Sequence, residues 1–239
     1  MRPQAEGLAP LAPRVIHRHT RDMSHHTFTL ANETLHALPS GALVAPTHAT
    51  LIVSDLHLGK SDRIARRTGT LIPPYENTET LQKLATDIAA SDPRTVICLG
   101  DSFDDLASVD ALDDSHRATL AQLQAGRRWI WIEGNHDPGP VDLGGTHLAQ
   151  THLGGIALRH IATDATPEVS GHYHPKLALK GLGRARACFV YDQDRLILPA
   201  YGAYTGGLSA QHPDLRKLFG AQAIAVLTGH KALPVPLKP

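Results

Sequence analysis

Four short motifs rich in Asp, Asn and His lie in the middle of the sequence. They are Asp55-Leu56-His57, Gly100-Asp101-Ser102-Phe103-Asp104, Gly134-Asn135-His136-Asp137 and Gly171-His172-Tyr173-His174. Carboxylate, amide and imidazole groups are the donors that hold Zn²⁺, Mn²⁺ or Fe²⁺ in proteins. Asp55 and His57 stand two residues apart at a predicted strand end, so both side chains can point to the same side. The four motifs together predict a site for two divalent metal ions and a metal-dependent hydrolase.

Buried strands are predicted directly before three of these motifs. The apolar, β-rich runs span residues 49–54, 95–99 and 128–133. Helical patterns over residues 77–90 and 113–124 separate them. A strand–helix–strand order favours parallel pairing, and the carboxyl ends of parallel strands meet at one edge of a sheet. We therefore expect three motifs to be delivered to the same edge.

The second half of the chain is predicted to form a further sheet. Short strand-like pieces with close turns cover residues 156–160, 169–171, 187–191 and 196–199. Close turns are typical of antiparallel pairing. The predicted fold class is therefore α/β, with two sheets packed as a sandwich and helices flanking them.

Length and composition favour one domain. The chain has 239 residues and no Ser/Gly-rich linker, so residues 23–239 are predicted to form a single domain. Residues 1–22 are rich in Pro and Arg and lack periodicity, which predicts a disordered extension; translation from Met23 is an alternative start. There is no membrane span or signal peptide pattern, and the isolated Cys98 and Cys188 suit buried thiols. A cytoplasmic protein is expected.

The formal net charge is zero, so nucleic-acid binding would have to depend on local basic patches. The chain has 16 histidines, and His17, His19, His25 and His26 crowd its start, where they are a weak metal signal. Seven more fit no motif and are assigned structural or solvated roles: His36, His48, His116, His147, His152, His212 and His230.

The ordered motifs, with a lone histidine before the last one, resemble the calcineurin-like metallophosphoesterase superfamily. The chain is more narrowly similar to the ligase-associated DNA damage response endonucleases, the PdeM family. The narrower resemblance is carried by Asp55-Leu56-His57-Leu58-Gly59-Lys60, Leu158-Arg159-His160, Gly171-His172-Tyr173-His174-Pro175, Cys188-Phe189 and the string Leu198-Pro199-Ala200-Tyr201-Gly202-Ala203-Tyr204-Thr205-Gly206-Gly207. That string has no obvious metal role.

The resemblance implies a role for each motif residue. Asp101 would bridge the two ions, which a carboxylate with two oxygens can do. The first ion would be held by Asp55, His57 and His174, and the second by Asn135, His160 and His172. A hydroxide between the ions would attack phosphorus, and Mn²⁺, Zn²⁺ and Fe²⁺ all suit this donor set.

The remaining motif residues are predicted to move and orient protons. His136 follows the ligand Asn135 and is expected to protonate the leaving oxygen as a general acid, with Asp137 as its orienting partner. Asp104 is expected to hold a ligand imidazole or a metal-bound water.

Two basic clusters flank the predicted site. Lys60, Arg63 and Arg67 recur at helical spacing after the first motif, with Arg66 beside them. The second cluster is Lys176, Lys180, Arg184 and Arg186. Contacts to a DNA backbone and an ordinary solvated surface are both consistent with them. Tyr201 or Tyr204 in the glycine-rich string would either stack on bases or pack into the core.

The sequence therefore predicts a phosphodiester hydrolase, and most specifically a DNA endonuclease of DNA repair. By resemblance its partners would include a DNA ligase, a helicase and an exonuclease. A small-molecule phosphodiesterase or pyrophosphatase is the alternative, which a narrow pocket over the ions would favour. A non-catalytic scaffold is the third hypothesis, and retention of His136 beside seven ligands argues against it.

Overall fold

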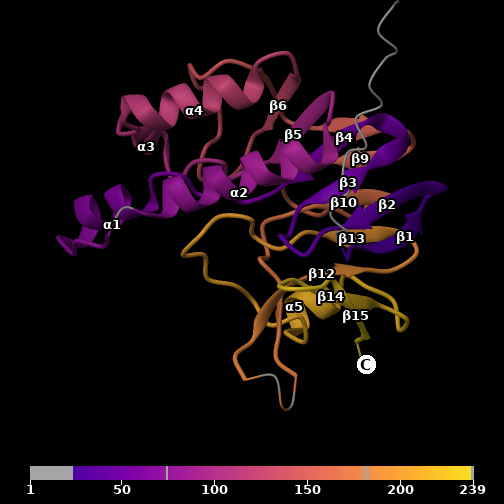
Figure 1. The fold of residues 1–239 in the computed structure, drawn as a ribbon. Coiled ribbons are helices and arrows are strands. Elements are labelled where there is room, and N and C mark those ends of the chain that lie inside the picture. Colours follow the sequence, from indigo (N-terminus) through magenta and orange to yellow (C-terminus); the bar gives the residue numbers. More distant parts are fainter. Residues whose placement is uncertain (1–23, 74, 180, 182, 238–239) are drawn as a thin grey trace, which may run out of the picture.

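A computed structural model describes residues 24–73, 75–179, 181 and 183–237. Two β-sheets pack face to face, and the long helices lie together on one side of this pair (Figure 1). The predicted extension of residues 1–22 and the alternative start at Met23 lie outside the described residues. No helix in the described part of the chain has the length and apolar character that crossing a membrane requires.

The first sheet has the strand order β1-β2-β3-β4-β5-β6-β7. Its antiparallel part is β1 (His26–Leu30), β2 (Glu33–Ala37) and β3 (Leu43–Ala45), which pairs with β4. The parallel part is β4 (Thr50–Val53), β5 (Thr95–Leu99), β6 (Arg128–Ile132) and β7 (Thr146–Leu148). The three strands predicted before the motifs are thus confirmed, with their parallel pairing.

The second sheet has the order β15-β14-β12-β13-β10-β9-β8, and β11 pairs with β12 beside it. The bounds are β8 (Thr151–Leu153), β9 (Ile156–Leu158), β10 (Glu168–Ser170), β11 (Lys176–Leu177), β12 (Arg186–Tyr191), β13 (Arg195–Ile197), β14 (Ile224–Leu227) and β15 (Leu233–Pro236). The predicted antiparallel character holds for most pairs but is wrong for β10, which runs parallel to both β9 and β13. The chain between β9 and β10 is a long crossover in place of a hairpin turn, and it carries His160.

Helices connect the strands and cover the outer faces. They are η1 (Pro46–His48), α1 (Lys60–Thr68), α2 (Glu76–Ser91), α3 (Leu106–Asp110), α4 (Asp114–Gln124) and α5 (Pro213–Arg216). The two helices predicted from periodicity correspond to α2 and α4. Helix α4 begins where Asp113 accepts a hydrogen bond from the backbone N–H of His116, a typical N-cap.

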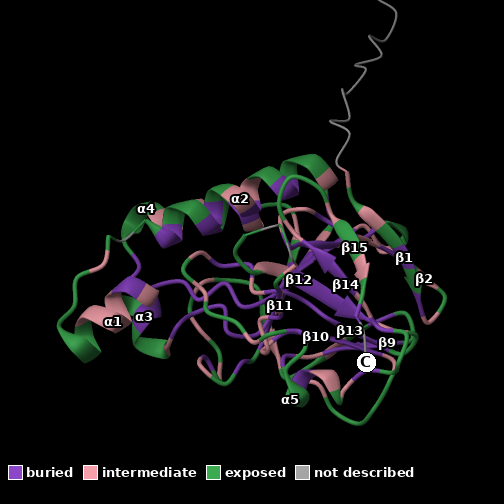
Figure 2. Cartoon of the chain, turned by 90° about the horizontal axis from the view of Figure 1, so that it is seen from below, coloured by how far each residue is buried: buried purple, intermediate pink, exposed green. Residues whose placement is uncertain are grey.

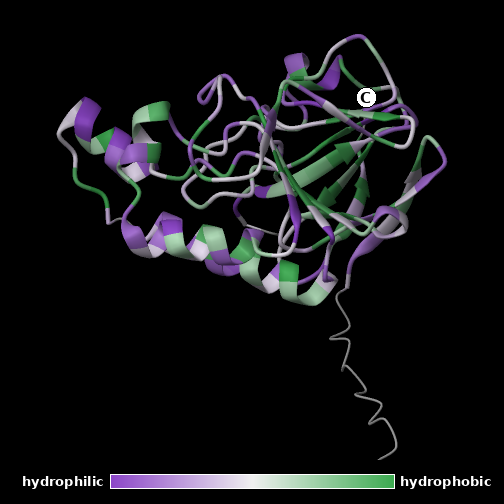
Figure 3. Ribbon diagram, turned by 90° about the horizontal axis from the view of Figure 1, so that it is seen from above, coloured by the Kyte–Doolittle hydropathy of each residue, from purple (hydrophilic) through white to green (hydrophobic). Residues whose placement is uncertain are grey.

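Alternation along the strands divides the core into layers. In β5, Ile97 and Leu99 face the second sheet, while Val96 and Cys98 face α2 and α4. The other face of the second sheet packs on α5 through residues that include Cys188 and Leu215. Figure 2 shows the buried strands inside and exposed turns on the outer sides of the helices, and Figure 3 shows the same division in hydropathy. Both cysteines are buried free thiols, as predicted.

Candidate metal centre

The loops that follow β4, β5, β6, β9 and β10 bring the predicted ligands to one place. Several of these loop residues adopt a left-handed backbone, which L side chains rarely take and which the surroundings must enforce. They are Asp55 (φ 55°), His57 (φ 46°), Asp101 (φ 47°), His172 (φ 72°) and His174 (φ 47°). These strained backbones lie at the residues whose donor atoms converge.

The first group of donors is Asp55, His57 and His174. Nε2 of His174 lies 3.0 Å from Oδ1 of Asp55 and 3.3 Å from Nε2 of His57. The ligand atoms of these three residues all lie within 4.8 Å of one another. The sequence assigned these same residues to one ion.

The second group combines Asp101, His160 and His172, whose ligand atoms also lie within 4.8 Å of one another. Nε2 of His160 is 3.3 Å from Oδ2 of Asp101 and 3.0 Å from Oδ1 of Asn135. Nδ1 of His160 donates to the carbonyl oxygen of Leu99 at 2.8 Å. This bond directs Nε2 into the group, because a hydrogen bond to one ring nitrogen orients the other toward a metal ion.

Charge and burial at these groups fit divalent cations. Asp55 and Asp101 are almost completely buried, and ionised carboxylates are rarely buried without a cation or a hydrogen bond. Burial raises the pKa of Asp101, but the hydrogen bond and charge of His160 outweigh burial and lower it to about 2. Two ionised carboxylates and several imidazoles with close ring nitrogens form a donor set that Mn²⁺, Zn²⁺ and Fe²⁺ accept.

Asp104 contacts one proposed ligand from behind. Its Oδ1 lies 2.9 Å from Nδ1 of His57, and its Oδ2 accepts from Nη1 of Arg63 at 2.9 Å. Burial raises the pKa of Asp104, but His57 and Arg63 together hold it well below its usual range. Asp104 therefore lies behind the imidazole of His57; the sequence predicted that it holds a ligand imidazole or a metal-bound water.

His136 lies at the mouth of the same site, with 28% of its side chain exposed. Its Nδ1 is 2.8 Å from the backbone carbonyl oxygen of Asp104 and 3.2 Å from Nη1 of Arg63. Its Nε2 is 3.9 Å from Oδ2 of Asp101. The imidazole thus presents Nε2 toward the proposed metal centre.

The predicted orienting role of Asp137 is not what the structure shows. Its carboxylate accepts hydrogen bonds from the backbone N–H groups of Asp101, Ser102, Phe103 and Gly134 at 2.8–3.2 Å. Both oxygens are therefore used to join two ligand loops. Asp137 points back into the protein and does not contact the His136 ring in these bonds. The ring is instead held by the backbone carbonyl of Asp104.

The segment from Leu198 to Gly207 packs against the loop that carries Asp55 and His57, which is the first ligand loop. The N–H of Tyr201 donates to the carbonyl of Ser54 at 2.8 Å, and that of Gly202 donates to the carbonyl of Asp55 at 3.0 Å. A β-carbon at Gly202 would overlap the carbonyl oxygen of Leu56. Sequence reasoning missed this role, although the length of the string was the signal that could have indicated it.

The two tyrosines of this segment differ. Tyr201 is 0% exposed, so stacking of bases on it is excluded and the core alternative is correct. Tyr204 is 47% exposed.

The basic clusters are only partly free for a substrate. Arg63 binds Asp104, Lys60 lies 4.0 Å from the same carboxylate, and Arg67 is exposed. Arg66 pairs with Asp62 and Asp105, which neutralises much of the outer face of α1.

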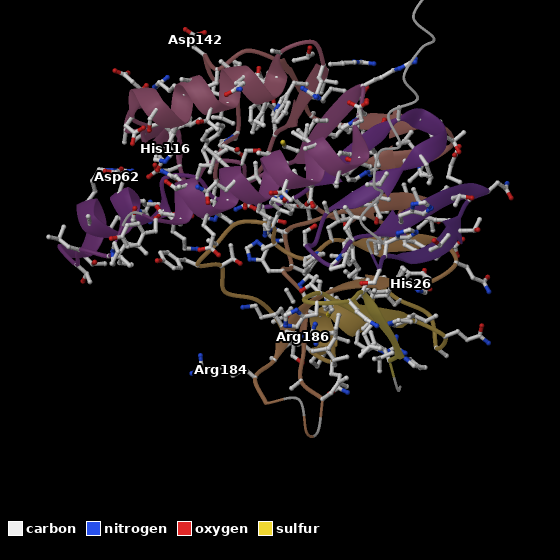
Figure 4. The ribbon with its side chains drawn as sticks, viewed as in Figure 1. His26, Asp62, His116, Asp142, Arg184 and Arg186 are labelled. Carbon is white, nitrogen blue, oxygen red and sulfur yellow. The ribbon has the colours of Figure 1, made fainter. Side chains whose placement is uncertain are left out.

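In the second cluster, Lys176 donates to the carbonyl of Thr205, and Lys180 lies outside the described residues. Arg184 extends into solvent from the loop before β12, whereas Arg186 lies close to the body of the protein (Figure 4). This cluster therefore does not form a continuous basic face in the described residues.

Comparison with known proteins places this geometry in a family. The sequence model described as "Calcineurin-like phosphoesterase" matches residues 48–220, which contain every proposed ligand. The crystal structure of Pseudomonas putida nuclease MPE is similar, with a TM-score of 0.70 and 26% identity over 88% of this chain and 100% of that chain. A search of curated proteins found no match. The chain therefore belongs to the calcineurin-like phosphoesterase family and is a metal-dependent phosphoesterase.

Proposed function

We propose that this phosphoesterase cleaves phosphodiester bonds of DNA internally, as an endonuclease of DNA repair. The observation that carries the proposal is the convergence of Asp55, His57 and His174 with Asp101, His160 and His172, in a chain similar along most of its length to a nuclease. His136 lies in a third close group, with His57 and Asp104. The similarity to that nuclease supports a nucleic-acid substrate, since its whole chain is covered. Action with a DNA ligase, a helicase and an exonuclease stays a prediction of the sequence resemblance, and cytoplasmic location stays a prediction from the sequence features described above.

We propose that Asp55, His57 and His174 hold one ion, that Asn135, His160 and His172 hold the other, and that Asp101 serves both. Two bound divalent ions would supply Lewis acidity and a nucleophile from water at neutral pH. Mn²⁺ is the first metal to test, and Zn²⁺ and Fe²⁺ fit the same nitrogen and oxygen donors.

His136 supplies the proton in this proposal. The carbonyl of Asp104 accepts from Nδ1, so Nε2 is the nitrogen that faces the reacting phosphate. Nε2 gives a proton to the leaving oxygen, so the leaving group departs as an alcohol and not as an alkoxide. The partial exposure of the ring allows bulk water to restore the proton after each turnover.

The charged residues of α1 divide into two kinds in this proposal. Arg63 and Lys60 lie beside Asp104, so they would contact only the phosphate that is bound at the metal centre. Arg67 is exposed, so its guanidinium is free to meet a backbone phosphate farther along a polynucleotide. A small phosphodiester would not reach such a position, which separates the two candidate substrates.

The test is cleavage of closed circular single-stranded DNA by the Mn²⁺-loaded protein, beside a generic chromogenic phosphodiester. A circle has no ends, so a break in it requires internal cleavage. His136→Ala is expected to lose about 100-fold or more of the cleavage rate while keeping its bound metal. His152→Ala is the matched control, because His152 is exposed on β8 and belongs to none of the three close donor groups.

The outcomes separate the hypotheses. Cutting of the circle that depends on His136 supports the endonuclease. Hydrolysis of the chromogenic diester with an intact circle would refute the DNA assignment and favour the small-molecule phosphodiesterase. Binding of metal without hydrolysis of either substrate would favour the scaffold.

A further inference from the structure

Helix α2 contacts the segment that supports the first ligand loop. Three of its side chains, at Thr80, Lys83 and Asp87, recur at helical spacing and therefore lie on one face of the helix. Each of them forms a hydrogen bond with Tyr201 or Ala203 of the segment from Leu198 to Gly207. The ligand loop, the segment and the helix thus form three consecutive layers.

Lys83 makes the central contact of this face. Its ammonium group donates to the carbonyl oxygen of Tyr201, lies 3.4 Å from the carbonyl oxygen of Ser40, and stands 3.9 Å from the centre of the Tyr201 ring. A cation over an aromatic face gains electrostatic attraction in addition to the hydrogen bonds. The ammonium group therefore fixes both the backbone and the ring of Tyr201.

Two neighbouring contacts complete the attachment. The hydroxyl of Tyr201 donates to Oδ2 of Asp87 at 2.7 Å, and the N–H of Ala203 donates to Oγ1 of Thr80 at 3.0 Å. Tyr201 is fully buried, and Asp87 and Thr80 are also buried. Because these groups have lost water, each bond restricts the segment more than a surface bond would.

The far side of the segment leaves little freedom to the ligand loop. Tyr201 and Gly202 bond the carbonyls of Ser54 and Asp55, and Gly202 has no room for a β-carbon against Leu56. Asp55 and His57 have left-handed backbones that cost free energy unless the surroundings enforce them. A displacement of the segment would therefore relax the backbone that aims both ligands.

We propose that Lys83 is a positioning residue of the metal centre, and that it fixes Asp55 and His57 through the backbone of Tyr201 and Gly202. Lys83 touches neither an ion nor a substrate in this inference. This role of Lys83 rests on the two-ion arrangement proposed above. The ion held by Asp55, His57 and His174 is the one whose binding depends on Lys83.

The experiment is a titration of the apo protein with Mn²⁺, in which the electron paramagnetic resonance signal of the free ion measures binding. The unaltered protein is expected to bind two ions, which tests the arrangement itself. Lys83→Met keeps the length of the side chain but removes the ammonium group. It is expected to weaken one of the two sites by about 10-fold to 100-fold and to leave the other near its original affinity.

Two further variants separate positioning from general loss of stability. Lys83→Arg retains a donor for the Tyr201 carbonyl and is expected to bind the weaker ion more tightly than Lys83→Met does. Leu35→Ala removes a fully buried side chain of β2 whose core cluster contains neither Tyr201 nor a residue of α2, so it is expected to lower stability without this effect. Thermal unfolding of the apo proteins ranks their stabilities.

Each result has a distinct meaning. Unchanged affinities of both sites in Lys83→Met would overturn the role of Lys83, as would an equal weakening in Leu35→Ala at matched stability. Binding of fewer than two ions by the unaltered protein would instead overturn the two-ion arrangement.

Discussion

Oδ1 of Asp104 lies 2.9 Å from Nδ1 of His57, and both side chains are buried. A carboxylate at this distance favours the tautomer with the proton on Nδ1, which leaves the lone pair of Nε2 for a metal ion. A carboxylate behind an imidazole also increases the basicity of the ring, which strengthens a metal bond. The same Asp104 holds Arg63 with its second oxygen and His136 with its backbone carbonyl, so one residue organises a ligand and the proposed acid.

The first prediction is that Asp104→Ala weakens Mn²⁺ binding by about 10-fold to 100-fold. Without the carboxylate, the His57 ring loses both its tautomer preference and its fixed orientation. Isothermal titration calorimetry of the apo protein measures the change. Asp105→Ala is the matched control, because Asp105 pairs with Arg66 and caps α3 but contacts no proposed ligand. Equal losses in both variants would refute the orienting role.

The second prediction concerns Gly202→Ala. The added methyl group would overlap the carbonyl oxygen of Leu56, between the ligands Asp55 and His57. The loop must move, so we expect Mn²⁺ affinity to fall by at least about 10-fold while the far-ultraviolet circular dichroism keeps its shape. Gly206→Ala serves as the control, since a β-carbon there meets no atom within 4 Å. Normal metal binding by Gly202→Ala would show that the loop tolerates displacement.

The strands that carry the ligands could be predicted from sequence because each ends at a motif. β5 was predicted without error, whereas the predicted β4 is one residue too long at each end and the predicted β6 is one residue too long at its carboxyl end. Buried parallel strands are continuous apolar runs, and the polar residue that follows such a run is easily recognised. The helical spacing of Lys60, Arg63 and Arg67 likewise corresponds to α1.

The rest depends on contacts between residues far apart in the sequence. The bond from Gly202 to Asp55 joins two loops of different sheets, and no local pattern encodes it. The carboxylate of Asp137 accepts hydrogen bonds from four backbone N–H groups that come together only in the folded chain. Its proximity to His136 in the sequence therefore suggested the wrong partner. The parallel pairing of β10 was missed for the same reason, because β10 pairs with strands on both sides through long connections.

The third prediction is that Glu168→Gln destabilises the protein strongly. Glu168 is completely buried on β10, where its carboxylate is 2.7 Å from Nε of Arg195 and 3.5 Å from Nε of Arg159. Loss of its charge leaves the buried guanidinium of Arg195 without a counter-ion, which costs about 3–5 kcal/mol. Urea unfolding followed by tryptophan fluorescence gives the free energy of unfolding.

The comparison for Glu168 is Asp214→Asn, which removes an exposed carboxylate 2.9 Å from Nζ of Lys217. Exposed pairs are screened by water and contribute little, so the unfolding curve is expected to stay where it is. A loss in Glu168→Gln no larger than that in Asp214→Asn would mean that Arg195 finds other partners.

The fourth prediction concerns stability at alkaline pH. Burial raises the pKa of the Cys188 thiol from 9.0 to about 12, and burial raises the pKa of Cys98 as well. Between pH 9.0 and about pH 12, the Cys188 thiol has lost its proton in the unfolded chain but keeps it in the folded chain. The stabilisation is therefore complete below pH 9.0 and is lost as the pH rises toward 12, by about 1.4 kcal/mol per pH unit for one thiol.

Replacing the thiol removes this loss, so Cys188→Ala should lose less stability than the unaltered protein between about pH 7.5 and about pH 10. Urea unfolding at both pH values gives the difference directly. Val190→Ala is the matched control, because Val190 lies on the same strand and packs in the same cluster but does not ionise. Its stability is expected to be lower by the same amount at both pH values. If Cys188→Ala instead follows the slope of the unaltered protein, the thiol ionises at the same pH whether the chain is folded or unfolded, and burial of this side chain does not hold its proton.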